Sequence, residues 1–120
     1  MMIATSSPTD PRLTVVAKII HDLSDLVQLM LKGLARTKAW QRQLAGHLED
    51  VDRLLQVLRM TIAMENAHDE IAGAAEAVAA ACRRAGASLA GSRADSSSLQ
   101  AMALIGKLGD KLRAAFASLP

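Results

Sequence analysis

Residues 13–62 read LTVVAKIIHDLSDLVQLMLKGLARTKAWQRQLAGHLEDVDRLLQVLRMTI, and this stretch decides the fold. Steps of alternately three and four residues select one series of positions, here called the seam: Leu13, Val16, Ile20, Leu23, Val27, Met30, Leu34, Thr37, Gln41, Leu44, Leu48, Val51, Leu55, Leu58 and Ile62. All of them are large and apolar except Thr37 and Gln41. A seven-residue repeat of this length predicts helices that pack against helices.

The composition also indicates an all-α protein. Of the 120 residues 51% are hydrophobic, yet there is one Trp, one Phe and no Tyr. Ala, Leu and Met supply the apolar content and favour helices, whereas strands favour aromatic and β-branched residues. The length suits one domain with a single core. The net charge of +2 is too small to indicate nucleic-acid binding by itself.

The first turn is the hardest boundary to place. Gly33 can end a helix as a left-handed residue, with Thr37 capping the next helix. A break at Gly46 and an unbroken helix to about residue 65 are the alternatives, and such a helix would be about 80 Å long. We favour a hairpin with its turn at 33–37, because the seam is polar at Thr37 and Gln41.

The buried face predicted for this hairpin is wide. The residue before the seam is also apolar in several repeats, as at Ile19, Leu26 and Leu54. This breadth suits an antiparallel bundle of about four helices better than a two-stranded coil. This apolar face is also wider than one hairpin covers, so we expect the bundle to self-associate as a dimer or a larger assembly.

The domain organisation is simple. Residues 1–9 are predicted to be a flexible tail, and residues 10–120 a single helical domain that starts with Asp10 as cap and Pro11 as first helical residue. No stretch has the roughly twenty apolar residues of a membrane span.

An Ala-rich third helix is expected after a break at 66–69. It should end near Ala85, with Gly86 as its cap, and be followed by a mobile Gly/Ser/Ala linker at 86–96. The small side chains of this third helix predict that a neighbouring helix approaches it closely. The single Cys82 lies in this helix and cannot form an internal disulfide, so we expect a buried thiol and a cytoplasmic protein.

A fourth helix should begin at a capping box formed by Ser97 and Gln100 and run to about Ser118. Its predicted buried stripe is Leu104, Leu108, Leu112, Ala115 and Leu119, flanked by Met102, Ile105 and Phe116. Met30, Met60, Met64 and Met102 are expected to fill gaps in the core.

One histidine could carry chemistry. The segment His21-Asp22-Leu23-Ser24-Asp25-Leu26-Val27-Gln28 resembles the phosphoacceptor helix of sensor histidine kinases, in which an exposed His followed by an acidic residue opens a helical hairpin. The resemblance implies that His21 accepts a phosphoryl group with the help of Asp22. Asp25 stands where that family usually has Asn, Thr or Gln. The alternative is an exposed histidine that pairs with Asp25 one turn on.

A basic stretch is the second candidate site. Lys32, Arg36, Lys38 and Arg42 surround Trp40, with no acidic residue between Asp25 and Glu49. Such a cluster could bind an acidic protein partner or, less favourably, nucleic acid. A solvated turn of a helical hairpin would have the same composition.

No metal site, cofactor or paired-carboxylate site is predicted. His47 and Glu49 do not share a helix face, and His68 has no second histidine at ligand spacing. We therefore expect a non-enzymatic helical protein–protein interaction module, such as an adaptor, chaperone-like or assembly subunit. The alternative is a histidine-phosphotransfer module that uses His21.

Overall fold

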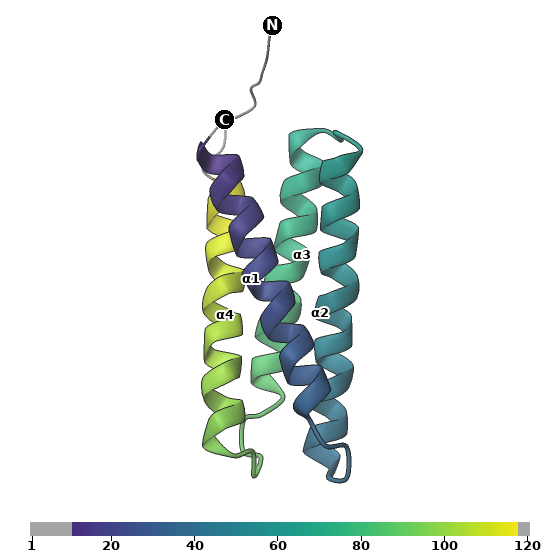
Figure 1. Cartoon of the computed structure of the whole chain (residues 1–120), viewed down its shortest axis with the longest axis vertical. Helices are drawn as coiled ribbons and strands as arrows, with labels where there is room; N and C mark the ends of the chain where they lie inside the picture. Colours follow the sequence, from purple (N-terminus) through teal and green to yellow (C-terminus); the bar gives the residue numbers. More distant parts are fainter. Residues whose placement is uncertain (1–10, 118–120) are drawn as a thin grey trace, which may run out of the picture.

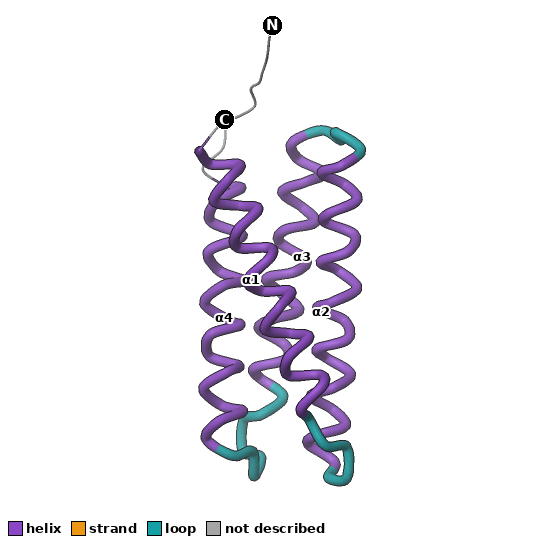
Figure 2. The backbone as a smooth tube through the Cα atoms, in the orientation of Figure 1, coloured by secondary structure: helices purple, strands orange, loops and turns teal. Residues whose placement is uncertain are grey.

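The computed structural model describes residues 11–117, which form an antiparallel four-helix bundle. The helices are α1 (Pro11–Gly33), α2 (Ala39–Ala63), α3 (His68–Ala87) and α4 (Ser96–Ala117), and these residues contain no strand. Each helix packs against its two neighbours in a closed ring, α1 on α2 and α4, and α3 on the same two (Figure 1). Short loops join them, so successive helices alternate in direction (Figure 2). The predicted fold class is confirmed. The predicted tail, the Asp10 cap and Leu119 lie outside the described residues.

The first turn lies where the hairpin prediction placed it. α1 ends at Gly33 and α2 begins after Lys38, so the break at Gly46 and the single long helix were both wrong. Gln41 Oε1 closes the turn by accepting hydrogen bonds from the backbone N–H groups of Thr37, at 3.1 Å, and Lys38, at 2.9 Å. Lys38 rather than Thr37 is therefore the N-cap residue of α2. The backbone of Gly33 is not in the left-handed conformation.

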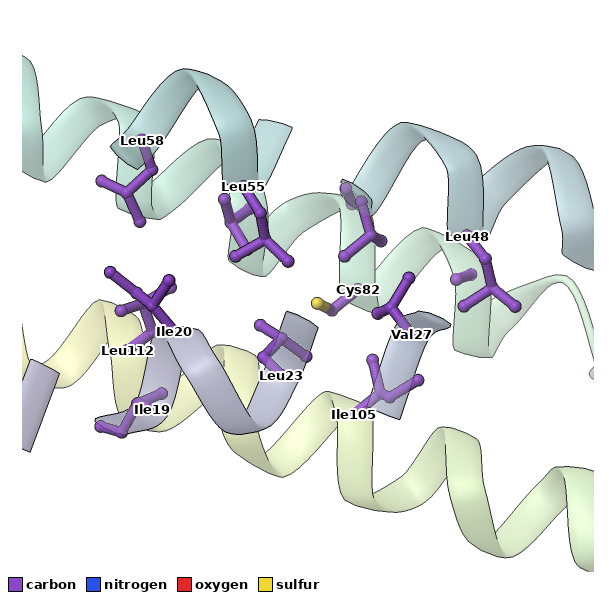
Figure 3. Close-up of a cluster of buried hydrophobic side chains, with 14 of the residues drawn as sticks. Ile19, Ile20, Leu23, Val27, Leu48, Leu55, Leu58, Cys82, Ile105 and Leu112 are labelled. Carbon is purple, nitrogen blue, oxygen red and sulfur yellow. The ribbon is translucent and has the colours of Figure 1, made fainter. Parts of the chain in front are cut away.

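The seam forms the core, as predicted. Its fully buried members are Val16, Ile20, Leu23, Val27, Leu44, Leu48, Val51, Leu55 and Leu58. Figure 3 shows side chains from α1, α2 and α4 converging with Cys82 of α3 on one interior. Of the two polar seam positions, Thr37 lies in the turn and Gln41 lies in the first turn of α2. Neither therefore interrupts the core.

Small residues let α3 and α4 approach each other closely, as the sequence predicted. A Cβ atom added at Gly109 of α4 would lie 3.1 Å from Cys82 Cβ, 3.2 Å from its Sγ and 3.5 Å from Ala79 Cα. These distances are at or below van der Waals contact. A glycine is required here because the neighbouring helix occupies the space of a side chain.

The buried stripe of α4 differs from the prediction. The structure buries Met102, Ile105, Gly109, Leu112 and Phe116. Among the described members of the predicted stripe, Leu104, Leu108, Leu112 and Ala115, only Leu112 is fully buried, and Leu104 is half exposed. The residues predicted to flank the stripe, Met102, Ile105 and Phe116, therefore lie on the buried face of α4. Gly109 lies at the middle of this face, and a search for hydrophobic residues passes over it.

The α2–α3 turn contains a non-glycine residue in the left-handed region. Glu65 has φ = 54°. Its backbone N–H donates to the carbonyl of Ile62 at 3.0 Å, and that of Asn66 donates to the carbonyl of Thr61 at 3.2 Å. This pair of hydrogen bonds is a Schellman motif, in which glycine is the preferred residue at the position of Glu65.

The α3–α4 loop is shorter than the predicted linker. Gly86 does not cap α3, which continues to Ala87, and Leu89 is buried in the core. Asp95, not Ser97, caps α4, because Asp95 Oδ1 accepts from the backbone N–H of Ser98 at 3.4 Å. None of the described helices is long and apolar enough to cross a lipid bilayer.

Candidate functional site

A pocket opens between the helices at the end of the bundle where α1 begins. α1 crosses the bundle obliquely, with its first turns beside α4 and its last turns beside α2 (Figure 1). The pocket has a volume of about 570 Å³. It is lined by Val16, Ala17, Ile20, His21, Arg59, Ile62, Ala63, Asn66, His68, Ile71 and Phe116. We call it the open-end pocket.

The walls of the open-end pocket are mainly aliphatic, and four polar side chains lie among them. Asn66 is engaged, since its Nδ2 donates to Glu70 Oε2 at 3.0 Å. Arg59 makes no ion pair or side-chain hydrogen bond with any described residue. No Asp or Glu is among the described residues that line the pocket. The site thus combines an apolar interior with a guanidinium that no described residue pairs.

His21, the candidate phosphoacceptor, lies at this pocket with its side chain 69% exposed. Its Nε2 is 3.1 Å from Asp25 Oδ2. Asp22, the helper that the resemblance implied, pairs instead with Lys18, whose Nζ is 2.8 Å from Asp22 Oδ2. The acidic group placed to orient the His21 ring is therefore Asp25.

The basic stretch lies at the opposite end of the bundle, and part of its charge is already engaged. Arg36 pairs with Glu49 at 3.6 Å. Arg42 Nη1 donates to the backbone carbonyls of Arg36, at 3.2 Å, and Thr37, at 2.9 Å, so it holds the turn together. These contacts give both arginines a structural role.

The remaining members of the basic stretch are two exposed lysines and a tryptophan. Lys32 and Lys38 have no ion pair with a described residue. Trp40 is half-buried against the core, and its buried indole N–H has no hydrogen-bond partner in the described part of the chain. The ring thus serves mainly in packing, and two exposed lysines are a small surface for recognising a partner.

An exposed apolar stripe on α2 was missed from the sequence. Val57 and Met60 of α2 and Met64, the residue that caps its C-terminus, are 46%, 61% and 65% exposed, and their spacing places them along one side of the helix. We call these three residues the α2 stripe. Two of the methionines expected in the core are therefore on the surface, whereas Met102 is buried as predicted. The sequence contains a sign that these two methionines are exposed, because neither Met60 nor Met64 falls on the seam.

Cys82 is not a reactive site. It is buried, and that burial, with a smaller contribution from Asp110, raises the pKa of its thiol to about 12. The thiolate is the nucleophilic form, so this thiol is inert at neutral pH. No group of three His, Cys, Asp or Glu residues within 11–117 is arranged to hold a metal ion.

Fold and site together define the class of this protein as a small all-α four-helix bundle with an apolar pocket at one end. No model of a known protein family matches the chain, and no curated protein or solved structure matches it either. The proposals for its function therefore rest on the pocket and the surfaces of the bundle.

Proposed function

We propose that this protein is a non-enzymatic helical interaction module that binds a helix of a protein partner against the α2 stripe. One observation carries the proposal: three large apolar side chains are exposed along a single helix whose opposite face is core. Unbranched methionine side chains adapt to different partners and are frequent on such surfaces. We place this activity in the cytoplasm, on the sequence argument given above.

The surroundings of the α2 stripe define the chemistry of that partner. Residues 53–64 contain no acidic residue. Arg53 pairs with Asp50 at 3.2 Å, so Arg59 supplies the positive charge that no described residue neutralises. A partner helix with apolar residues three and four apart, flanked by Asp or Glu, would match both the apolar face and the positive charge.

A second copy of this chain is the alternative occupant. The sequence suggested self-association because the seam was wider than one hairpin could cover. In the structure α3 and α4 cover it within one chain, so a second chain is not needed to complete the core. Self-association would then involve the α2 stripe, and a dimer of this kind would keep the proposed role.

Photo-crosslinking in the native cell tests this proposal. A photoreactive phenylalanine analogue is introduced at Met60 or Met64, with exposed Gln43 of the same helix as the matched control position. We expect discrete crosslinked products from the two stripe positions and none from position 43. The products should disappear when Val57→Asp is added, because a charge in the contact is costly to desolvate. Equal crosslinking from all three positions, or none, would refute the proposal.

Histidine phosphotransfer through His21 is the second candidate function. Its support is the exposed imidazole on a helix of a four-helix bundle, with Asp25 placed to orient the ring. The chain has no glycine-rich nucleotide-binding motif, so a kinase or a phosphorylated receiver domain would be the phosphoryl donor. The phosphoryl group would move to a ring nitrogen as the donor's bond to it breaks.

The test is incubation with a phosphorylated receiver domain or a promiscuous histidine kinase. Base-stable, acid-labile label that is lost in His21→Gln, but kept in His47→Gln, would establish the activity. Loss of label on Asp25→Asn but not Asp22→Asn would identify Asp25 as the positioning residue. Absence of label, or label that survives His21→Gln, would eliminate this function.

A further inference from the structure

The open-end pocket has the features of a small-molecule site, which the proposed interaction module does not require. We propose that it binds an aliphatic monocarboxylate of medium chain length, with the chain between α1 and α2 and the carboxylate on Arg59. None of the three stripe residues lines the pocket, so the apolar part of this site is separate from the α2 stripe, whereas Arg59 is common to the pocket and to the surroundings of the stripe.

The size and walls of the pocket fit an alkyl chain. Its volume of about 570 Å³ lies within the range of about 300–1,000 Å³ typical of small-molecule sites. Val16, Ile20, Ile62, Ile71 and Phe116 supply aliphatic and aromatic walls from all four helices. No Ser, Thr or Tyr is among the described residues that line the pocket, so its polar groups are limited to the side chains of His21, Arg59, Asn66 and His68.

The charge of the pocket selects an anion. Arg59 is half-buried, and the ion pairs of the described residues leave its guanidinium without an acidic partner. A guanidinium binds a carboxylate through two parallel hydrogen bonds. His68 lines the same pocket and can donate a further hydrogen bond, whereas Nε2 of His21 already lies 3.1 Å from Asp25 Oδ2. No described acidic residue lines the pocket itself.

The arrangement follows from the tilt of α1. Because α1 leaves α2 at this end and leans on α4, Ile62 and Ala63 of α2 lose the neighbour that covers Leu48 and Leu55 lower in the bundle. The seam residue Ile62 is accordingly only half-buried. An alkyl chain would replace the missing packing.

Titration of the full chain with octanoate, decanoate and dodecanoate, followed by calorimetry and by amide chemical shifts, tests the proposal. Affinity should rise about fourfold for each added CH2 group until the pocket is full. The shifts should map to Ile20, Ile62 and Ile71. Arg59→Gln should weaken carboxylate binding about tenfold or more, leave decan-1-ol binding unchanged, and differ from Arg53→Gln, the matched control on the same helix.

A second variant separates loss of the pocket from loss of the fold. Ala17→Phe places a ring in the pocket without removing any buried side chain, so it should abolish binding while the helical content stays that of the wild type. Binding to vesicles of anionic phospholipid in preference to free dodecanoate would overturn the proposal. So would no saturable binding in the wild type, or binding that Arg59→Gln leaves intact.

Discussion

At the scale of single residues, Gly109 explains more of the packing than any large side chain of α4. It lies on the buried face of α4, where an added Cβ would meet Cys82 and Ala79 of α3 at contact distance or closer, so its lack of a side chain permits the close approach of the two helices. A prediction based on hydrophobicity chose the stripe through Leu104 and Leu108. The sequence could not show that a residue without a side chain would be central to an interface.

Gly109→Ala should destabilise the protein by about 1–3 kcal/mol, because the new methyl group overpacks against Cys82. Gly106→Ala in the same helix is the matched control. Its added Cβ meets nothing within 4 Å, so it should stabilise by about 0.8–1 kcal/mol through helix propensity. Urea unfolding of both variants measures the difference, and effects of the same sign would contradict the packing described here.

Leu55 tests the seam at the same scale. It is fully buried, so Leu55→Ala should cost about 2–5 kcal/mol through lost transfer free energy and the cavity left behind. Lys38 is exposed and forms no ion pair with a described residue, so Lys38→Ala should change stability by no more than about 0.5 kcal/mol. Thermal melts that coincide for the two variants would show that the seam is wrongly placed.

At the scale of helices and turns, the sequence predicted the existence and type of every element and several of their ends. The α1–α2 hairpin was correctly preferred because polar seam residues mark a turn. The capping residues were predicted less well, since Lys38 and Asp95 replaced Thr37 and Ser97. The N-cap is the residue at which the chain enters the helix. Several neighbouring polar residues can fill this position at similar free energy, so the sequence does not determine which one does.

The α2–α3 turn gives a prediction of increased stability. Glu65 has a left-handed backbone, which costs a residue with a Cβ about 1–2 kcal/mol, whereas glycine loses about 0.5–1 kcal/mol in entropy. Glu65→Gly should therefore stabilise the protein by roughly 0.5–1 kcal/mol. Glu65→Ala keeps a Cβ and should not. Denaturation of the three proteins side by side checks this, and a gain in the alanine variant would point to charge rather than backbone.

The cap of α4 gives a prediction for pH. A hydrogen bond from the Ser98 side chain, then one from its backbone N–H, with a small contribution from Lys38, holds the pKa of Asp95 below its ordinary value of 3.8. The ionised carboxylate therefore stabilises the folded state above pH 3.8, and this contribution is lost as the pH falls through the lower, folded-state pKa.

Comparison of the wild type with Asp95→Asn measures that contribution. The difference in unfolding free energy should be constant near neutral pH and should shrink in acid. The substitution keeps an acceptor at the cap but removes the titration. A difference that grows as the pH falls would contradict the assignment of Asp95 as the cap.

At the scale of the whole molecule, the tilt of α1 shapes the open-end pocket. His21, Arg59 and Phe116 are far apart in the sequence and meet only because α1 crosses from α2 to α4. Helical periodicity places residues on faces but does not determine the angle between helices, so the open-end pocket could not be predicted. The basic stretch, which was visible in the sequence, proved to be partly a structural turn.

The central claim is that one chain completes its own core and leaves the α2 stripe for a partner. Sedimentation equilibrium of the purified Met60→Glu/Met64→Glu variant at micromolar concentration tests this most directly, with a thermal melt of the same sample. Both residues are exposed, so we predict a monomer with the mass of one 12.7 kDa chain and a cooperative melt within about 0.5 kcal/mol of the wild type in stability. A dimer that persists in this variant, or a variant that no longer folds, would show that a second chain shares the core and would contradict the account.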